Sequence, residues 1–171
     1  YAQALAVGVE SYAEELDCYL RKALEPEDVA ARLRQVLPEG LEVVECWRVP
    51  LKCGSVSETI HGVEYRVEAI FEESDARFST AEFHRDVLAQ FQGSQCVELP
   101  GYAQEEQNAL NMGTYVRELL LLEQEGGRVK FQMSLRALNG VTPRPEMILR
   151  KVYERLAVRF DVTRVVKVRA W

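Results

Sequence analysis

The stretch that decides the fold reads Arg128-Val129-Lys130-Phe131-Gln132-Met133-Ser134-Leu135-Arg136. Its apolar and polar side chains alternate, and a period of two residues is typical of a β-strand with one face buried and one face in water. Residues 115–123 supply an apolar partner strand, and Gly126-Gly127 provides the positive φ angle that a tight turn needs. The sequence therefore predicts a β-hairpin over residues 115–136.

A helix and a final strand follow this hairpin. Pro145 suits the first position of a helix, because its missing N–H would have no partner there. Ile148, Leu149 and Val152 then fall on one apolar stripe. Residues 162–170 are rich in valine and predict a strand. Strand, strand, helix and strand in this order make up the second half of a split βαβ fold.

The same reasoning extends this unit toward the N-terminus. Residues 63–71 predict a strand, and residues 79–82 have the spacing of a capping box at a helix start. Gly93 ends that helix, and residues 95–99 predict a short strand. Residues 63–171 are therefore expected to form a ferredoxin-like unit with one added strand.

Residues 1–50 repeat the order of the second half. A helix is expected to begin at Pro26, and strands are predicted around residues 1–7, 16–20 and 41–49. Residues 51–62 are a connector in which Ser55, Ser57 and Glu58 allow one short helical turn. We therefore expect an α+β fold of tandem ferredoxin-like units, with the first truncated to its second half, and antiparallel sheets with helices on one face.

The amino-acid composition limits the classes of protein to which the chain could belong. The 171 residues are 47% hydrophobic, which is enough to form a sizeable core. No apolar run approaches the roughly 20 residues that span a bilayer, and no signal-peptide pattern opens the chain. We therefore expect a cytoplasmic protein without membrane association. The four cysteines are Cys18, Cys46, Cys53 and Cys96. No two of them have C-x-x-C spacing, which excludes a zinc ribbon.

The charges are unevenly distributed along the chain. Residues 128–171 contain 11 Lys or Arg against 3 Asp or Glu, whereas residues 1–127 contain 10 against 24. One interpretation is pairing of acidic with basic segments, for example across the hairpin. The other is a basic face for phosphate or RNA, built from Lys130, Arg136, Arg144, Arg150, Lys151 and Arg155.

A second candidate site lies at a predicted turn. Glu10, Ser11 and Glu14 could act as a general base or bind a cation, or they could satisfy backbone N–H groups of the turn. Lys52 in the connector could meet a phosphate or a carboxylate, or be a solvated lysine. His84 has no second histidine spaced to join it, so we expect no metal site.

Short motifs along the chain together resemble a known family. They are Ala4-Leu5-Ala6-Val7-Gly8-Val9-Glu10-Ser11 with Glu14, Leu37-Pro38-Glu39-Gly40-Leu41, Val49-Pro50-Leu51-Lys52, Glu64-Tyr65, Asn111-Met112-Gly113-Thr114-Tyr115-Val116 and Arg144-Pro145-Glu146. In their order and spacing the chain resembles the bacterial radical SAM-linked domain of unknown function 2344 (DUF2344). The resemblance covers nearly the whole chain.

The resemblance implies an accessory role. Family members occur beside radical SAM proteins, or fused to their C-terminal end, and those proteins often carry a B12-binding domain. A partner in cis or in trans would then hold the iron–sulfur cluster, SAM and, in some cases, cobalamin, with no cofactor in this chain. Members usually begin with a strand and an Arg-rich helix ahead of Tyr1, which implies a truncated first unit. Asn111 and Met112 stand where the family tends to have Asp and Arg.

Three hypotheses about function follow. The cluster Cys-x3-Cys-x2-Cys of radical SAM chemistry is absent, so this chain is not the radical enzyme itself. The leading hypothesis is a noncatalytic accessory domain for substrate presentation or partner docking. The alternative is an RNA- or tRNA-binding module in RNA modification or processing, and the third is an independent enzyme that uses Glu10 and Glu14. An incomplete first unit would leave a sheet edge open, which makes a homo-oligomer a further hypothesis.

Overall fold

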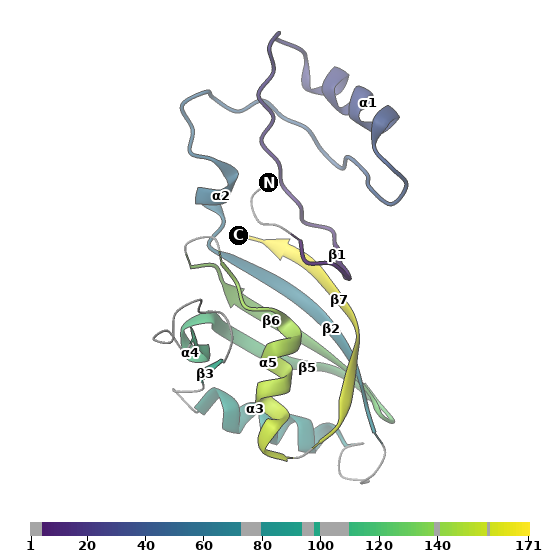
Figure 1. Cartoon of the computed structure of the whole chain (residues 1–171), viewed down its shortest axis with the longest axis vertical. Coiled ribbons are helices and arrows are strands. Elements are labelled where there is room, and N and C mark those ends of the chain that lie inside the picture. Colours follow the sequence, from purple (N-terminus) through teal and green to yellow (C-terminus); the bar gives the residue numbers. More distant parts are fainter. Residues whose placement is uncertain (1–4, 73–79, 94–97, 100–109, 139–140, 157) are drawn as a thin grey trace.

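A five-stranded sheet with two helices on one face forms the body of the molecule (Figure 1). The computed structural model describes residues 5–72, 80–93, 98–99, 110–138, 141–156 and 158–171. The strands lie side by side in the order β1 (Val9–Ser11), β7 (Phe160–Ala170), β2 (Gly62–Phe71), β6 (Arg128–Arg136) and β5 (Val116–Glu125). β1 runs parallel to β7, and the other neighbours are antiparallel.

Chain order and strand order together give the ferredoxin-like arrangement. The chain passes from β2 through α3 (Ala81–Gly93) to β5, turns into β6, and passes through α5 (Pro145–Tyr153) to β7. The four strands therefore follow the split βαβ pattern, with each crossover helix on the same face. The predicted α+β class is confirmed.

The core lies between the sheet and these two helices. Val129, Phe131, Met133 and Leu135 of β6 are completely buried, while the residues between them face the other side of the sheet. The apolar stripe of α5 covers them, and the helix begins at Pro145 as predicted. Gly126 has a φ of +55° in the hairpin turn, the conformation for which glycine is suited.

An aromatic cluster with one histidine fills the end of this core. His84 of α3 is fully buried, and its Nδ1 lies 2.7 Å from the hydroxyl oxygen of Tyr153. The ring centroids of Phe71 and Phe131 lie 4.7 and 6.1 Å from the centroid of the imidazole ring. Burial raises the pKa of Tyr153 above its ordinary value, so this hydroxyl stays protonated at neutral pH. His84 is therefore part of the core.

The added strand of the main sheet differs from the predicted one. Of the strand expected over residues 95–99, only β3 (Glu98–Leu99) lies within the described residues. It pairs with β4 (Leu110–Asn111) in a separate two-stranded sheet, and α4 (Met112–Tyr115) follows directly. The main sheet is extended by β1 instead.

Residues 12–51 form an arm that projects from the sheet (Figure 1). It contains α1 (Pro26–Val36), which begins at the predicted proline, and leads to α2 (Val56–Thr59), the short helix expected in the connector. The strands predicted around residues 16–20 and 41–49 are wrong, because the structure has no strand there. A segment in which apolar and polar residues alternate forms a strand only where a neighbouring strand provides partners for its backbone hydrogen bonds. The predicted division of the chain at residues 51–62 stays a prediction.

Candidate functional site

Glu10 and Ser11 do not lie in a turn as predicted, because they belong to strand β1. Its three residues pair with Val165, Val166 and Lys167 of β7, and the Tyr12 N–H donates to the Lys167 carbonyl oxygen at 2.9 Å. Successive side chains of a strand point to opposite faces. Glu10 therefore lies on the open face of the sheet, and Ser11 lies on the face that carries the helices.

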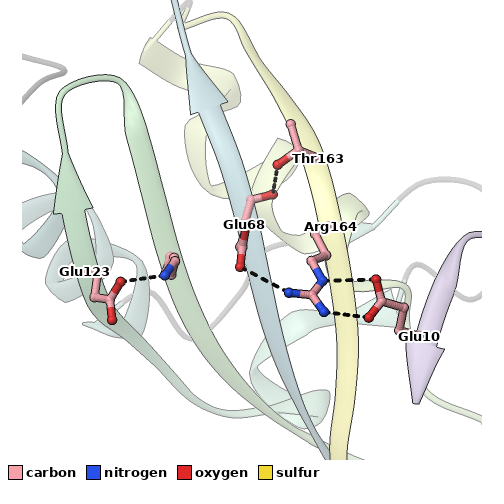
Figure 2. Close-up of polar contacts among 6 residues, drawn as sticks. Glu10, Glu68, Glu123, Thr163 and Arg164 are labelled. Carbon is pink, nitrogen blue, oxygen red and sulfur yellow. Dashed lines mark hydrogen bonds and ion pairs between the residues drawn. The ribbon is translucent and has the colours of Figure 1, made fainter.

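A row of charged side chains crosses the open face (Figure 2). Arg164 donates from Nε to Glu10 Oε1 at 3.0 Å and from Nη2 to Glu10 Oε2 at 2.6 Å. Its Nη1 lies 3.8 Å from Glu68 Oε1, and farther along the row Lys130 Nζ lies 2.6 Å from Glu123 Oε2. The Glu10 carboxylate is therefore paired with Arg164 of β7.

The guanidinium of Arg164 sets the protonation behaviour of Glu10. Its hydrogen bonds hold the pKa of the Glu10 carboxyl below the usual value of 4.5. Because the folded-state pKa is the lower one, the pair stabilises β1 above the unfolded pKa and loses that contribution as the pH falls through the folded pKa. Glu10 is thus fully ionised at neutral pH.

We expect β1 to loosen from β7 in acid. As the pH falls below about 4.5, the protection of the amide protons of residues 9–11, which is their exchange corrected for its intrinsic pH dependence, should decrease in the wild type. In Arg164→Met the protection of these amides should already be low at pH 7 and should change less on acidification. Hydrogen exchange followed by NMR measures both. Equal pH dependence in the two proteins would show that the pair does not hold the strand.

The helix-covered face contains a buried ion pair. Lys167 is 2% exposed, and its Nζ lies 2.7 Å from Glu14 Oε1. The same carboxylate oxygen accepts a hydrogen bond from Ser11 Oγ at 2.8 Å, and Ser11 Oγ accepts one from the Ala13 N–H at 3.2 Å. Ser11 thus satisfies a local backbone N–H, as the capping interpretation expects, and Glu14 neutralises the Lys167 ammonium. A general-base or cation-binding role of these residues stays a prediction.

Lys167 borders a cavity of about 270 Å³ between β1, β2, β7 and the start of α5. Other polar side chains in its wall belong to Tyr65, Thr142, Arg144 and Glu146. Glu146 Oε2 is buried and has no hydrogen-bond partner among the residues that the structure describes. The residues around the cavity therefore include a buried lysine, a glutamate and an exposed arginine.

The sequence reasoning missed this cavity for an identifiable reason. Lys167 interrupts the run Val165-Val166-Lys167-Val168, and a lysine in an apolar strand was the available signal. Glu146 lies in the first turn of α5, where an acidic residue is ordinary, so it gave no separate signal. The site is formed when β1 and the start of α5 approach β7, and these segments are far apart in the chain.

The predicted basic residues do not share one surface. Lys130 and Arg136 lie on the open face of the sheet, whereas Arg150 and Lys151 lie on the outer side of α5, on the opposite face of the molecule. Arg144 borders the cavity. Lys130 pairs with Glu123, and Lys151 lies 2.5 Å from Glu154, as expected if acidic and basic residues pair locally. The side chain of Arg155 lies outside the described residues.

Lys52 is exposed in the loop before α2, and within the described residues no hydrogen bond or ion pair joins it to Glu10, Ser11 or Glu14. Within the described ranges there is no group of three or more His, Cys, Asp or Glu side chains able to hold a metal ion. No helix in this same part of the chain is long and apolar enough to cross a membrane.

Comparison with known proteins gives a family and a fold. Residues 1–145 match a family described as uncharacterized proteins conserved in bacteria, DUF2344. No curated protein matches the sequence. Among solved structures, a chain from the crystal structure of a Cbf5-Nop10-Gar1 complex aligns with a TM-score of 0.52 and 16% identity. The alignment covers 67% of this chain but 32% of that one, so the likeness concerns the fold.

Proposed function

Given that this chain belongs to the DUF2344 family, we propose that it is a noncatalytic accessory domain that docks onto a radical SAM enzyme in the cytoplasm. The family resemblance supplies the kind of partner. The chain has no Cys-x3-Cys-x2-Cys motif, so the iron–sulfur cluster and SAM, with cobalamin in some systems, belong to that enzyme.

The surface of the arm carries this proposal. Solvent reaches 81% of Tyr19, 59% of Trp47 and 88% of Leu51, and α1 buries only Ala30. Further exposed apolar side chains of the arm are Tyr12, Leu16, Leu20, Val36, Leu41, Val44 and Val49. Monomeric proteins rarely expose so many large apolar residues in one segment, and exposed tyrosine and tryptophan are typical anchors of protein interfaces.

The arm is also ordered enough to present these side chains. Arg34 Nη2 donates to the Val43 carbonyl oxygen at 2.9 Å, which links α1 to the segment that follows it. The Val56 N–H donates to Asp17 Oδ2 at 2.8 Å, which ties the first part of the arm to the start of α2. A partner can therefore bind without first ordering the whole segment, which lowers the entropic cost of association.

A radical SAM protein encoded beside this chain is the binding partner to test. We expect nuclease-treated, purified proteins to bind, and Tyr19→Ser with Trp47→Ser to weaken binding at least about tenfold, as loss of interface anchors does. Ile70→Ser is the matched control, because Ile70 is 43% exposed on the sheet and lies outside the arm. Titration calorimetry measures the affinities.

Three results would count against docking through the arm. They are no binding of the enzyme, equal affinities of the arm variant and the wild type, or self-association of the chain that the arm substitutions abolish. The last result would identify a second copy as the occupant of the arm.

RNA binding is the second candidate function, and one surface favours it. The Trp171 ring has the guanidinium carbons of Arg117 and Arg169 at 5.9 and 5.6 Å from its centroid. An aromatic ring with flanking arginines is a common platform for stacking bases. Recovery of a defined RNA by the wild-type protein, reduced in Arg117→Gln with Arg169→Gln and unchanged in the arm variant, would favour this candidate.

A further inference from the structure

The part of the arm between α1 and α2 has exposed apolar side chains and an unpaired backbone. Residues 41–49 read Leu-Glu-Val-Val-Glu-Cys-Trp-Arg-Val, and Val44 and Trp47 are 84% and 59% exposed. Figure 1 shows this segment as chain with neither helix nor strand. In the part of the chain that the structure describes, no backbone N–H of residues 42–49 donates a hydrogen bond to another residue. The segment therefore has a strand-like sequence without the neighbour that a strand needs.

One carbonyl group indicates which edge of this segment is open. The Val43 carbonyl oxygen accepts a hydrogen bond from Arg34 of α1. In an extended strand the N–H and C=O groups of one residue point to the same side, and those of the next residue point to the opposite side. An extended segment would thus turn the backbone of Val43 and Glu45 toward α1. The backbone of Glu42 and Val44 would then form the open edge.

Docking through the arm would remove water from these backbone groups. Trp47 is one of the proposed anchors, and an enzyme that covers its ring would also cover the neighbouring peptide groups. A backbone N–H that loses water without gaining an acceptor weakens binding. A helix uses its carbonyl groups internally, whereas an extended strand offers acceptors to a neighbour at every second residue. The unpaired backbone therefore favours a strand as the structure that covers it.

A second copy of the same segment is a poor partner. Glu45 is the central residue of the segment 41–49. Antiparallel pairing of two copies about this centre would place the two Glu45 carboxylates directly opposite each other, and like charges in that position destabilise a strand pair. We therefore expect the pairing strand to come from a different protein.

We propose that residues 41–46 become a β-strand in the complex by pairing with an exposed edge strand of the radical SAM enzyme. Backbone hydrogen bonds of Glu42 and Val44 contribute to the affinity, and the Trp47 ring fills a pocket beside the enzyme's strand, as in other cases of β-strand addition. The inference rests on the proposed docking to this enzyme, and it adds the kind of element that the enzyme contributes and the bonds that hold the two chains together.

Hydrogen exchange in the complex tests the pairing. The purified enzyme should slow the exchange of peptides that cover residues 41–49 at least about tenfold at pH 7, because strand hydrogen bonds protect amide protons. Peptides that cover α5 are the internal control and should exchange as in the free protein. No binding of the enzyme would overturn the docking proposal and this inference together. Binding without protection of residues 41–49 would overturn this inference alone.

Proline substitutions separate backbone pairing from side-chain contact. Val44→Pro removes an N–H at the open edge and should bind the enzyme at least about tenfold more weakly than Val44→Ala, which also lacks the valine side chain. Glu45→Pro removes an N–H on the side of α1 and should change the affinity less than about threefold. Both residues are exposed, so neither substitution disturbs the core. Equal affinities of Val44→Pro and Val44→Ala, measured by titration calorimetry, overturn the proposal.

Discussion

Replacement of Glu14 by alanine is expected to lower the free energy of unfolding by about 3 kcal/mol, because it leaves the buried ammonium of Lys167 without its carboxylate. This is the low end of the range for breaking a buried pair, since the Glu14 side chain is 30% exposed. Urea unfolding followed by circular dichroism measures the change.

Two further variants test whether the loss of stability comes from the unpaired buried charge of Lys167 or only from the removal of a side-chain contact. Glu14→Ala combined with Lys167→Met removes both charges and should recover stability to within about 1 kcal/mol of the wild type. Glu123→Ala breaks the pair between Glu123 and Lys130, whose side chains are 67% and 47% exposed, and should change stability far less because water screens an exposed pair. A double variant as unstable as Glu14→Ala would mean that the charge of Lys167 is not the cause.

Phe131→Ala is expected to lower the free energy of unfolding by about 3–5 kcal/mol, the usual cost of removing a buried aromatic ring. Phe131 is completely buried at the middle of β6, and its ring centroid lies 6.4 Å from that of Phe71 and 6.3 Å from that of Tyr153. The cavity left behind would be bordered by rings and strands that cannot close it.

The midpoint of urea unfolding again provides the measurement. Ile70→Ala is the control, because Ile70 is 43% exposed on the same sheet and should change stability by about 0.5 kcal/mol or less. Phe131→Leu should lie between the two, since leucine refills part of the space. Similar midpoints for Phe131→Ala and Ile70→Ala would show that the helix-covered face is not the main core.

Local patterns predicted the second half of the chain well. The alternation through β6 identified its buried face, Pro145 marked the first residue of α5, and Gly126 lies at the turn between β5 and β6. Pro26 likewise marked the start of α1. Each signal concerns residues within a few positions of one another, where backbone geometry and side-chain period act directly.

Local patterns failed in the arm for the same reason. Alternation of apolar and polar residues shows that a segment could form a β-strand. The strand forms only where a neighbouring strand is available to hydrogen-bond with its backbone. Residues 16–20 and 41–49 have no such neighbour within the described structure, and most of their large apolar side chains are exposed. The prediction of a basic face failed similarly, because Lys130 and Lys151 belong to opposite sides of one sandwich.

The sequence by itself determined the α+β class, the hairpin, the helix starts and the DUF2344 resemblance, because these depend on residue order and short-range geometry. Only the tertiary structure decided which side of the sheet receives each turn residue and which distant partner it meets. Glu10 meets Arg164 from 154 positions away, and Glu14 meets Lys167 from 153. Such contacts depend on the pairing of β1 with β7, which no local pattern specifies because the favourable contacts arise only after the chain closes a long loop.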